Sequence, residues 1–299
     1  MWPEFDIWDF ANKVRAADTV HRMDSRPTLL LSIDYEDWHQ LVRRRVGASN
    51  WSEPGPALAR QTRTLLALLD ELGVKATFFV LGMAARAHPE LVEAIAQRGH
   101  EIACHGDAHL PVYSQTPEEF AADLEAAKAT IEELTGVRPL GYRAPAFSIT
   151  DWAYDVLAGQ GFVYDASQLL RGRGAPTASL REFPVAVWRS PLRTMPVGGA
   201  SYWTVLPRRL VLHGLRQAGP LAGLYLHPQE LDPEPLRVGA RGASAVQQVH
   251  AALRSAQRNS ARRRAPAMLR AIAERFRLIP YGEAYASLRA GPRPQPVQR

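Results

Sequence analysis

The chain alternates short apolar runs with amphipathic segments of helical period, and this alternation restricts its fold more than any other feature. The expected strands include residues 28–33, 76–81, 101–104, 161–164, 185–188 and 221–226, and the expected helices include 57–72, 88–98, 116–134 and 152–158. Strands that are joined by crossover helices pair in parallel and are covered on both faces. The pattern therefore predicts an α/β fold, either a doubly wound sheet or a sheet closed as a barrel.

The composition excludes several other classes of protein. Of the 299 residues, 46% are hydrophobic and 22% are charged, as in an average globular protein. The single Cys excludes an intrachain disulfide framework and a multi-cysteine metal centre. Apolar runs stay far below the roughly 20 residues that span a bilayer, and the acidic N-terminal segment lacks the pattern of a secretory signal. We therefore expect a soluble, cytoplasmic protein.

Positive charge is concentrated in the C-terminal fifth of the chain. Residues 236–299 contain 13 Lys/Arg against 2 Asp/Glu, whereas the remainder contains 23 against 28. We expect an N-terminal extension at 1–26, an α/β body at 27–235, a basic helical region packed on that body at 236–290, and a disordered tail at 291–299.

An arginine cluster at 262–264 lies in the basic region. It indicates a solvated helix face or, alternatively, a surface attracted to anionic lipid or glycan, which would place the protein at the inner face of a membrane. No recognition motif for nucleic acid accompanies the charge, so nucleic acid is disfavoured as a partner. The sequence leaves the oligomeric state open.

Four chemically reactive side chains lie at or directly after the ends of separate expected strands. They are Asp34, His105, Arg143 and His227. The carboxyl ends of parallel strands carry the active site in α/β folds. We therefore expect these four side chains to share one pocket.

Two of the segments carry groups that bind metal ions. The segment Asp34-Tyr-Glu-Asp-Trp38 has three acids in four residues, which a metal, an arginine or exposure to solvent would accommodate. His105 and His109 are spaced to share a metal from one helical turn, although surface histidines reach this spacing by chance. Two histidines and one carboxylate form a set that suits Zn²⁺ or a redox metal.

The other two segments each offer one functional group, and for each a purely structural role is the alternative. Arg143 is followed by Pro145, which fixes an extended turn, and a surface salt bridge is the alternative role of the arginine. His227 follows an apolar strand, and strand alternation places Tyr225 on the same face. A purely structural histidine is the alternative there.

Taken together and in this order, the segments resemble those of the polysaccharide deacetylase family of carbohydrate esterases. The resemblance covers residues 27–235. It extends to the subgroup associated with bacterial exopolysaccharide synthesis, in which Asp-Val-Glu-Asp-Trp begins the domain and Tyr-Leu-His-Pro-Trp-Glu closes it. Here these segments read Asp34-Tyr-Glu-Asp-Trp38 and Tyr225-Leu-His-Pro-Gln-Glu230.

The resemblance implies a distorted (β/α) barrel and metal-dependent hydrolysis of N-acetyl groups on a sugar polymer. Zn²⁺ is the first choice of metal, with Co, Ni or Fe as alternatives. The family pattern has a second Asp where this chain has Tyr35, so the carboxylate ligand moves to Glu36, with Asp37 as the alternative. By motif position the implied roles are Asp34 as general base, His227 as general acid, Arg143 as the group that orients Asp34, His105 and His109 as metal ligands, and Leu224 as a border of the acetyl pocket.

Further residues are expected to contact the substrate. Pro145 and Tyr225 flank the motif residues, and Trp38, Trp188 and Tyr202 offer aromatic faces for sugar rings, although buried aromatics are commoner. Asp165 either holds Arg143 or closes a strand. Strand alternation turns Cys104 into the core. His39, His88 and His100 match no motif and are interpreted as bystanders.

The sequence thus predicts a hydrolase acting on carbon–nitrogen bonds, a polysaccharide N-deacetylase. Its expected partner is an acetylated aminosugar polymer or a lipid-linked oligosaccharide. Two alternatives stay open: a related hydrolase that cleaves a formyl group or a cyclic amide of a small substrate, and a carbohydrate-binding protein without turnover on the same fold.

Overall fold

The computed structural model describes residues 25–169, 180–189, 194–259 and 264–290. The expected extension (apart from its last two residues), the expected tail and the first two arginines of the 262–264 cluster lie outside the described residues. No helix among the described residues is long and apolar enough to cross a membrane.

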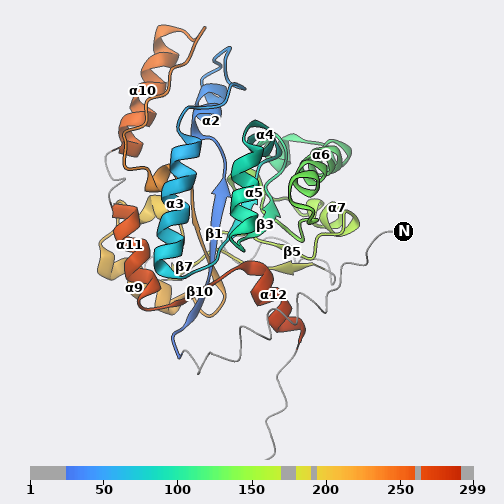
Figure 1. Cartoon of the computed structure of the whole chain (residues 1–299), viewed down its shortest axis with the longest axis vertical. Helices are drawn as coiled ribbons and strands as arrows, with labels where there is room; N and C mark the ends of the chain where they lie inside the picture. The colour runs from blue at the N-terminus through green and yellow to red at the C-terminus, as the bar shows by residue number, and fades with distance from the viewer. Residues whose placement is uncertain (1–24, 170–179, 190–193, 260–263, 291–299) are drawn as a thin grey trace, which may run out of the picture.

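A parallel sheet forms the centre of the molecule and curls into a half-barrel (Figure 1). Strand β1 pairs with β9 along one edge and with β2 and β10 along the other, and β3, β4, β5 and β6 continue beyond β2. The strands are β1 (Thr28–Tyr35), β2 (Thr77–Val80), β3 (Glu101–Cys104), β4 (Gly141–Tyr142), β5 (Tyr164–Asp165), β6 (Arg181–Glu182), β9 (Ala222–Leu226) and β10 (Arg277–Ile279), with β7 (Val187–Arg189) and β8 (Thr194–Pro196) as a separate antiparallel pair. The expected distorted (β/α) barrel is confirmed.

Helices surround this sheet. The α-helices are α2 (Trp38–Arg45), α3 (Leu58–Leu72), α4 (Gly82–Ala87), α5 (Pro89–Gln97), α6 (Pro117–Thr135), α7 (Ala153–Gly159), α8 (Ala200–Trp203), α9 (Arg208–Gln217), α10 (Ala245–Asn259), α11 (Arg264–Ala273) and α12 (Tyr281–Arg289). The 3₁₀ turns are η2 (Val112–Ser114), η3 (Pro145–Phe147) and η4 (Pro228–Leu231). Local signals set several ends: Gly73 closes α3 in a left-handed conformation, and Thr116 and Glu119 form a capping box that begins α6.

The two faces of the sheet carry different cores because side chains alternate along a strand. Leu31 and Ile33 of β1 belong to the large core that includes leucines of α3 and Ile95 of α5, and these two helices lie side by side over this face (Figure 1). The opposite face of β1 presents Leu30, which belongs to a smaller cluster with Phe79 and with Tyr281 of α12. Ser32 and Asp34 continue this second face towards the carboxyl end of β1.

The C-terminal region differs from the helical segment that the sequence predicted. The sequence predicted a basic helical region at 236–290, but Arg277 begins β10, which pairs with the first half of β1. The chain then turns into α12, whose first residue Tyr281 is fully buried beneath the sheet. This region is therefore built into the sheet as well as packed against it.

Candidate active site

The carboxyl ends of β1, β3, β4 and β9 bring the predicted reactive side chains into one cluster. Asp34 is the penultimate residue of β1, and His105, Arg143 and His227 directly follow the other three strands. All four side chains are largely buried, and the most exposed of them, His227, is 15% accessible. The expectation that these groups share one site is confirmed by their contacts.

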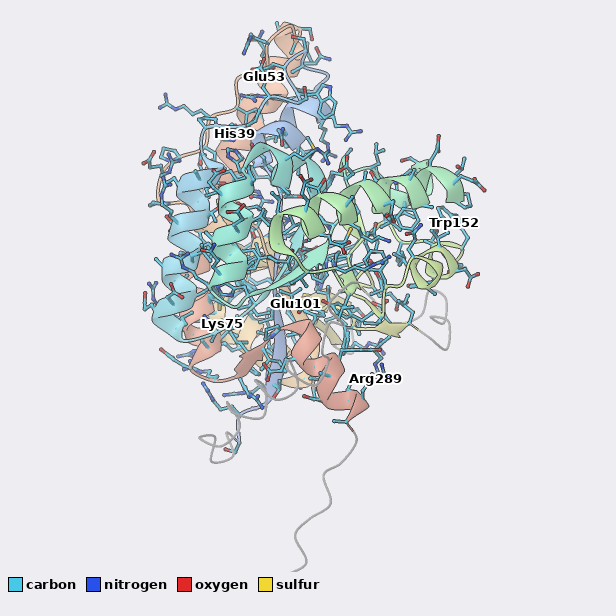
Figure 2. The ribbon with its side chains drawn as sticks, turned by 45° about the vertical axis from the view of Figure 1, so that its right-hand side comes forward. His39, Glu53, Lys75, Glu101, Trp152 and Arg289 are labelled. Carbon is cyan, nitrogen blue, oxygen red and sulfur yellow. The ribbon has the colours of Figure 1, made fainter. Side chains whose placement is uncertain are left out.

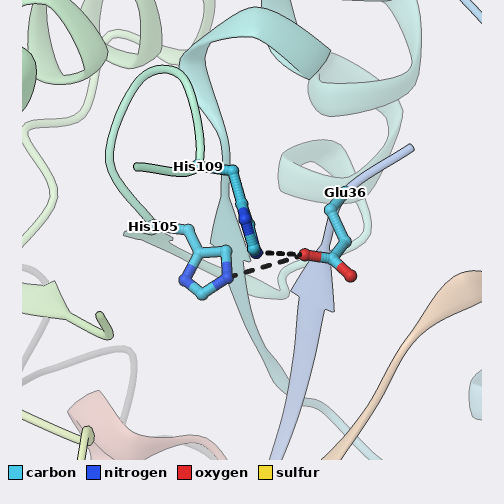
Figure 3. Close-up of side chains that lie close together, drawn as sticks. All are labelled: Glu36, His105 and His109. Carbon is cyan, nitrogen blue, oxygen red and sulfur yellow. Dashed lines mark ion pairs between the residues drawn. The ribbon is translucent and has the colours of Figure 1, made fainter. Parts of the chain in front are cut away.

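Glu36, His105 and His109 form a group that could hold a metal ion. One ligand atom from each residue lies within 4.8 Å of the other two. Glu36 Oε2 lies 3.0 Å from His109 Nε2 and 3.8 Å from His105 Nε2. Figure 3 marks both contacts with dashed lines. Two imidazoles and one carboxylate that converge in this way match the donor set of divalent transition metals with open coordination positions.

Hydrogen bonding prepares His105 for this role. Its Nδ1 lies 2.8 Å from the backbone carbonyl of Arg143, which can only accept, so Nδ1 carries the proton and Nε2 keeps its lone pair on the side of Glu36. Burial lowers the pKa of His105 to about 4, which keeps the ring neutral. Burial alone would raise the pKa of Glu36, but His109 and His227 outweigh it and lower the pKa to about 2.

The two histidines reach the site through a loop, which corrects the expectation of a helical turn. Gly106 adopts a left-handed conformation with φ 78°, and His109 does so with φ 55°, which is costly for a residue with a side chain. The carboxylate of Asp123 in α6 holds this loop by accepting hydrogen bonds from the amides of Asp107 and Ala108, at 2.9 and 3.3 Å. The loop thus presents both imidazoles to Glu36 without helical geometry.

Asp37, the alternative ligand, uses both carboxylate oxygens in hydrogen bonds to backbone amides. Its Oδ1 accepts a hydrogen bond from the amide of His39 at 2.8 Å and caps α2, and its Oδ2 accepts one from the amide of Gly55 at 2.5 Å. Both oxygens are therefore used to shape the chain after β1. The geometry favours Glu36 over Asp37 as the third member of the group.

Arg143 is fully buried and contacts the base candidate directly. Its Nη1 donates to Asp34 Oδ1 and to Ser32 Oγ, both at 2.6 Å, and its Nε donates to the carbonyl of Ala166 at 3.0 Å. Burial would lower the pKa of the guanidinium, but the negative charge of Asp34 outweighs it and raises the pKa. Asp34 is thus held in one orientation by a permanent cation.

His227 lies opposite this pair. Its Nε2 lies 3.5 Å from Glu36 Oε1 and 3.9 Å from Asp34 Oδ2, and its Nδ1 lies 3.2 Å from Glu230 Oε2. Burial would lower the pKa of His227, but the carboxylates of Glu230, Glu36 and Asp34 raise it to about 9. The ring is therefore protonated at neutral pH and can donate a proton from Nε2.

Two aromatic side chains, Tyr225 and Phe147, lie beside these groups. Tyr225 shares the face of His227, as strand alternation predicted, with ring centroids 5.9 Å apart, and the ring of Phe147 lies 4.8 Å from that of Tyr225. Pro145 begins the turn that carries Phe147, and both Ala146 and Phe147 adopt left-handed conformations. The extended turn that the sequence predicted is thus a 3₁₀ turn, Pro145–Phe147. Such strain in residues with side chains is typical of functional sites.

Three predicted substrate-binding residues are not brought to this cluster. Leu224 lies in the core on the other face of β9, because a residue three positions before His227 alternates to the opposite side. Trp188 donates its Nε1 to Gln217 at 2.7 Å and packs against His213 of α9. Asp165 ends β5, as the alternative expectation had it, and accepts hydrogen bonds from the hydroxyl and the amide of Ser167, at 2.7 and 3.0 Å.

The remaining predictions concern residues around the site. Cys104 is fully buried in a hydrophobic cluster, as expected. His100 packs on Phe78, and His88 lies 3.7 Å from Glu90, so both stand apart from the site. Trp38 is half-buried under the guanidinium of Arg258, with 4.7 Å between the guanidinium carbon and the ring centroid.

Two residues that touch the reactive groups escaped the sequence analysis. Glu230 lies inside the quoted terminal segment, and its spacing of three from His227 was an available signal. Tyr281 accepts a hydrogen bond from Arg143 Nη2 at 2.9 Å, although 138 residues separate the two positions. No local pattern in the sequence indicates that contact.

Two stretches of the chain match models of known families. Residues 53–164 match the family model described as polysaccharide deacetylase, and residues 164–285 match a domain of unknown function. Over residues 53–164 the chain is thus similar to the polysaccharide deacetylase family. The resemblance drawn from the four motifs is confirmed.

Particular relatives are similar over part of the chain. A peptidoglycan deacetylase of Helicobacter pylori is 31% identical over 103 residues, which are 34% of this chain and 35% of the relative. A peptidoglycan-N-acetylglucosamine deacetylase of Bacillus cereus is 27% identical over 129 residues, which are 43% of this chain and 59% of the relative. The chain thus spans less than two thirds of these relatives.

A solved structure extends the likeness of the fold to most of the chain. A Mycobacterium smegmatis protein assigned to the polysaccharide deacetylases superposes with a TM-score of 0.58 and 21% identity, covering 93% of this chain and 96% of that one. At this identity the comparison supports the fold alone.

Proposed function

We propose that this protein is a metal-dependent hydrolase that removes N-acetyl groups from a bacterial polysaccharide or its lipid-linked precursor. The observation that carries the proposal is the convergence of the group formed by Glu36, His105 and His109 with Asp34 and His227. A metal site, a proton acceptor and a proton donor then lie within reach of one acetamide, which is what hydrolysis of an unactivated amide needs.

The donor set fits a divalent metal, and Zn²⁺ is the metal we propose. His105 and His109 would bind through Nε2 and Glu36 through a carboxylate oxygen. A bound divalent metal would lower the pKa of its water towards about 7 and polarise the acetyl carbonyl. Zinc accepts this mixture of nitrogen and oxygen ligands and requires no redox partner.

Asp34 is the proposed general base. Arg143 keeps one oxygen of Asp34 occupied at 2.6 Å, which leaves Oδ2 on the side of His227 to take a proton from the attacking water. Arg143 also donates to Ser32 Oγ at 2.6 Å, so the guanidinium that holds Asp34 is itself fixed in place. Asp34 thus acts from a fixed position.

His227 is the proposed general acid. It is protonated at neutral pH, because the carboxylates around it raise its pKa to about 9. Its Nε2 faces the site and can give its proton to the nitrogen that leaves as the free amine. Tyr225 and Phe147 are proposed to line the space for the acetyl group or the sugar ring. The ring of Tyr225 packs against His227, and the ring of Phe147 packs against Tyr225.

The substrate class rests on the relatives and on the motifs. The relatives named above act, by their names, on peptidoglycan, so an acetylated aminosugar polymer is the first choice. The terminal segment of the exopolysaccharide-associated subgroup supports a bacterial exopolysaccharide or its lipid-linked precursor. Hydrolysis of a small formylated or cyclic amide substrate, or glycan binding without turnover, are alternative outcomes of the test.

Acetate release from defined N-acetylated aminosugar oligomers and from small amides tests this proposal. Wild-type protein should release acetate from an oligomer, lose this activity to a chelator and regain it with Zn²⁺. Binding of the oligomer without any acetate would contradict the hydrolase, and release only from small amides would contradict the polymer substrate. Undiminished release after complete removal of metal would contradict the metal mechanism.

A further inference from the structure

We propose that the C-terminal segment, residues 236–289, is part of the catalytic unit, because Arg258 positions the proposed acid and Tyr281 positions the proposed base. This inference rests on the proposed function. It assigns a role to the part of the chain that matches only a domain of unknown function. Neither residue faces the reacting atoms, so each would act through a neighbour.

Arg258 of α10 acts on the acid side through Glu230. Its Nη1 donates to Glu230 Oε1 at 2.7 Å and to Ser201 Oγ at 2.9 Å, while Ser201 Oγ also donates to the same Oε1 at 2.7 Å. The other oxygen of Glu230 accepts from the amide of His227 at 2.9 Å and lies 3.2 Å from its Nδ1. Both oxygens of Glu230 are therefore engaged, and the carboxylate has one orientation.

This arrangement fixes the imidazole of His227. A carboxylate oxygen can only accept, so Nδ1 carries a proton that points at Glu230, and Nε2 is turned towards Glu36 and Asp34, at 3.5 and 3.9 Å. Glu230 is 4% exposed, so its charge would be costly to bury without cations beside it. Burial alone would raise the pKa of Glu230, but His227 first and Arg258 after it lower the pKa to about 2. Arg258 thus keeps the partner of the acid ionised and in place.

The position of α10 is itself fixed at this point. The guanidinium of Arg258 also covers the ring of Trp38, which follows the acidic segment at the end of β1. The next residue, Asn259, hydrogen-bonds both the amide and the carbonyl of Leu236, at 2.8 and 2.9 Å. Arg258 therefore joins the end of β9 to the end of β1 from an anchored helix.

Tyr281 of α12 acts on the base side through Arg143. Its hydroxyl accepts a hydrogen bond from Arg143 Nη2 at 2.9 Å. Nη2 is the terminal nitrogen of the guanidinium that does not donate to Asp34. Gly223 in β9 makes room for this contact, because a Cβ atom there would lie 2.1 Å from the hydroxyl. The amide of Tyr281 is held in turn by Thr77 Oγ1 at 2.8 Å.

Kinetics of matched variants tests both contacts. In zinc-loaded full-length protein, Arg258→Gln and Glu230→Gln should each lower kcat about 10- to 100-fold with little change of KM, as losses of residues that orient a functional group do. Tyr281→Phe, which keeps the ring, should lower kcat about 10-fold. Arg270→Gln is the control, because Arg270 joins α11 to Glu71 by a comparable ion pair at 2.8 Å on the exposed surface.

A second background separates positioning from a general loss of structure. In a His227→Ala protein, Arg258→Gln and Glu230→Gln should lower the residual rate less than about twofold, because effects of residues that act as a unit do not add. Tyr281→Phe should likewise lose its effect in an Asp34→Asn protein. Equal losses in both backgrounds, or no loss in the wild-type background, would overturn the inference.

A measurement without substrate keeps the inference separate from the proposed function. In ¹⁵N-histidine-labelled, zinc-loaded protein, the Nδ1 proton of His227 should give a downfield NMR signal that disappears in Glu230→Gln and shifts or broadens in Arg258→Gln. Arg270→Gln should leave the signal unchanged. A signal indifferent to both Glu230→Gln and Arg258→Gln overturns the inference, whether or not the protein releases acetate.

Discussion

His227 Nε2 lies 3.9 Å from Asp34 Oδ2 across the ends of two adjacent parallel strands. The register of β9 against β1 sets this separation, since Leu226 pairs with Ile33 and the next residue of each strand is one of the two reactive groups. The proposed proton donor and the proposed proton acceptor thus face each other beside the group of Glu36, His105 and His109. Hydrolysis of an amide between them is the function that this relationship supports.

The loss of the acid should be the most damaging single change that spares the metal group. His227→Ala is expected to lower kcat/KM about 10²- to 10⁴-fold, the usual contribution of a positioned acid or base. Bound zinc should stay near the wild-type amount, because His227 is not one of the three proposed ligands. His250→Ala, in the exposed part of α10, is the control and should leave activity unchanged. Activity within threefold of wild type in His227→Ala would exclude the acid role.

The carboxylate ligand can be identified by metal content. Glu36→Ala should retain less than a tenth of the wild-type zinc after gel filtration, because it removes one of three donors. Asp37→Ala should keep the metal but lower the free energy of unfolding by about 1 kcal/mol, the typical cost of losing a helix N-cap. Elemental analysis and denaturant unfolding separate the two. Equal zinc in both variants would show that neither carboxylate is a principal ligand.

Glu101 anchors α12 at the end of the sheet opposite the site. Figure 2 shows this separation, because it labels both Glu101, which begins β3, and His39, which lies in α2 just after the carboxyl end of β1. The carboxylate of Glu101 accepts hydrogen bonds from Thr77 Oγ1 at 2.5 Å, from Tyr164 OH at 2.7 Å and from the amide of Gly282 at 2.8 Å. Glu101→Ala leaves these buried donors without their acceptor and should lower the free energy of unfolding by at least about 2 kcal/mol.

Denaturant unfolding measures this loss. Glu133→Ala, at an exposed position of α6, serves as the control and should change the free energy of unfolding by less than about 0.5 kcal/mol. If Glu101 and Glu133 proved equally tolerant of alanine, the anchoring of α12 through Glu101 would be wrong.

His100 should make folding stability depend on pH. Its Nδ1 accepts a hydrogen bond from the amide of Ala76 at 3.3 Å, its Nε2 has no hydrogen-bond partner among the described residues, and burial lowers its pKa to about 4. Between pH 6.5 and 4, His100 binds a proton in the unfolded chain but stays unprotonated in the folded protein. The stability is therefore complete above pH 6.5 and falls as the pH drops to 4, by at most about 1.4 kcal/mol per unit.

His100→Gln should remove this contribution. Unfolding free energies at pH 7 and pH 5 should differ less in the variant than in wild type, while the exposed His250→Gln should behave as wild type does. An unchanged pH dependence in His100→Gln would mean that the neutral, buried histidine is not responsible.

Much of the fold follows from local patterns in the sequence. The apolar runs at β1, β3 and β9 and the capping signals of α3 and α6 depend on neighbouring residues, so the sequence alone placed them within one or two positions. The reactive side chains were predictable for the same reason, because a polar residue directly after a buried strand must lie at the rim.

The parts of the fold and site that the sequence did not predict depend on contacts between distant segments. Strand β10 forms because it completes the edge of β1, and Tyr281 reaches Arg143 only because Gly223 lacks a side chain. The loop from His105 to His109 owes its shape to Asp123 in the following helix. Leu224 is different: strand alternation already turned it away from His227, and only the family resemblance suggested otherwise.

Stoichiometric reconstitution with zinc tests the central claim most directly. Chelated protein is titrated with Zn²⁺ while acetate release from an N-acetylated aminosugar oligomer is followed, in wild type and in Glu36→Ala. The wild-type rate should rise linearly and level off at one zinc per chain, whereas Glu36→Ala should show no such end point. A full rate before any zinc is added, or an identical titration in both proteins, would contradict a catalytic metal held by Glu36, His105 and His109.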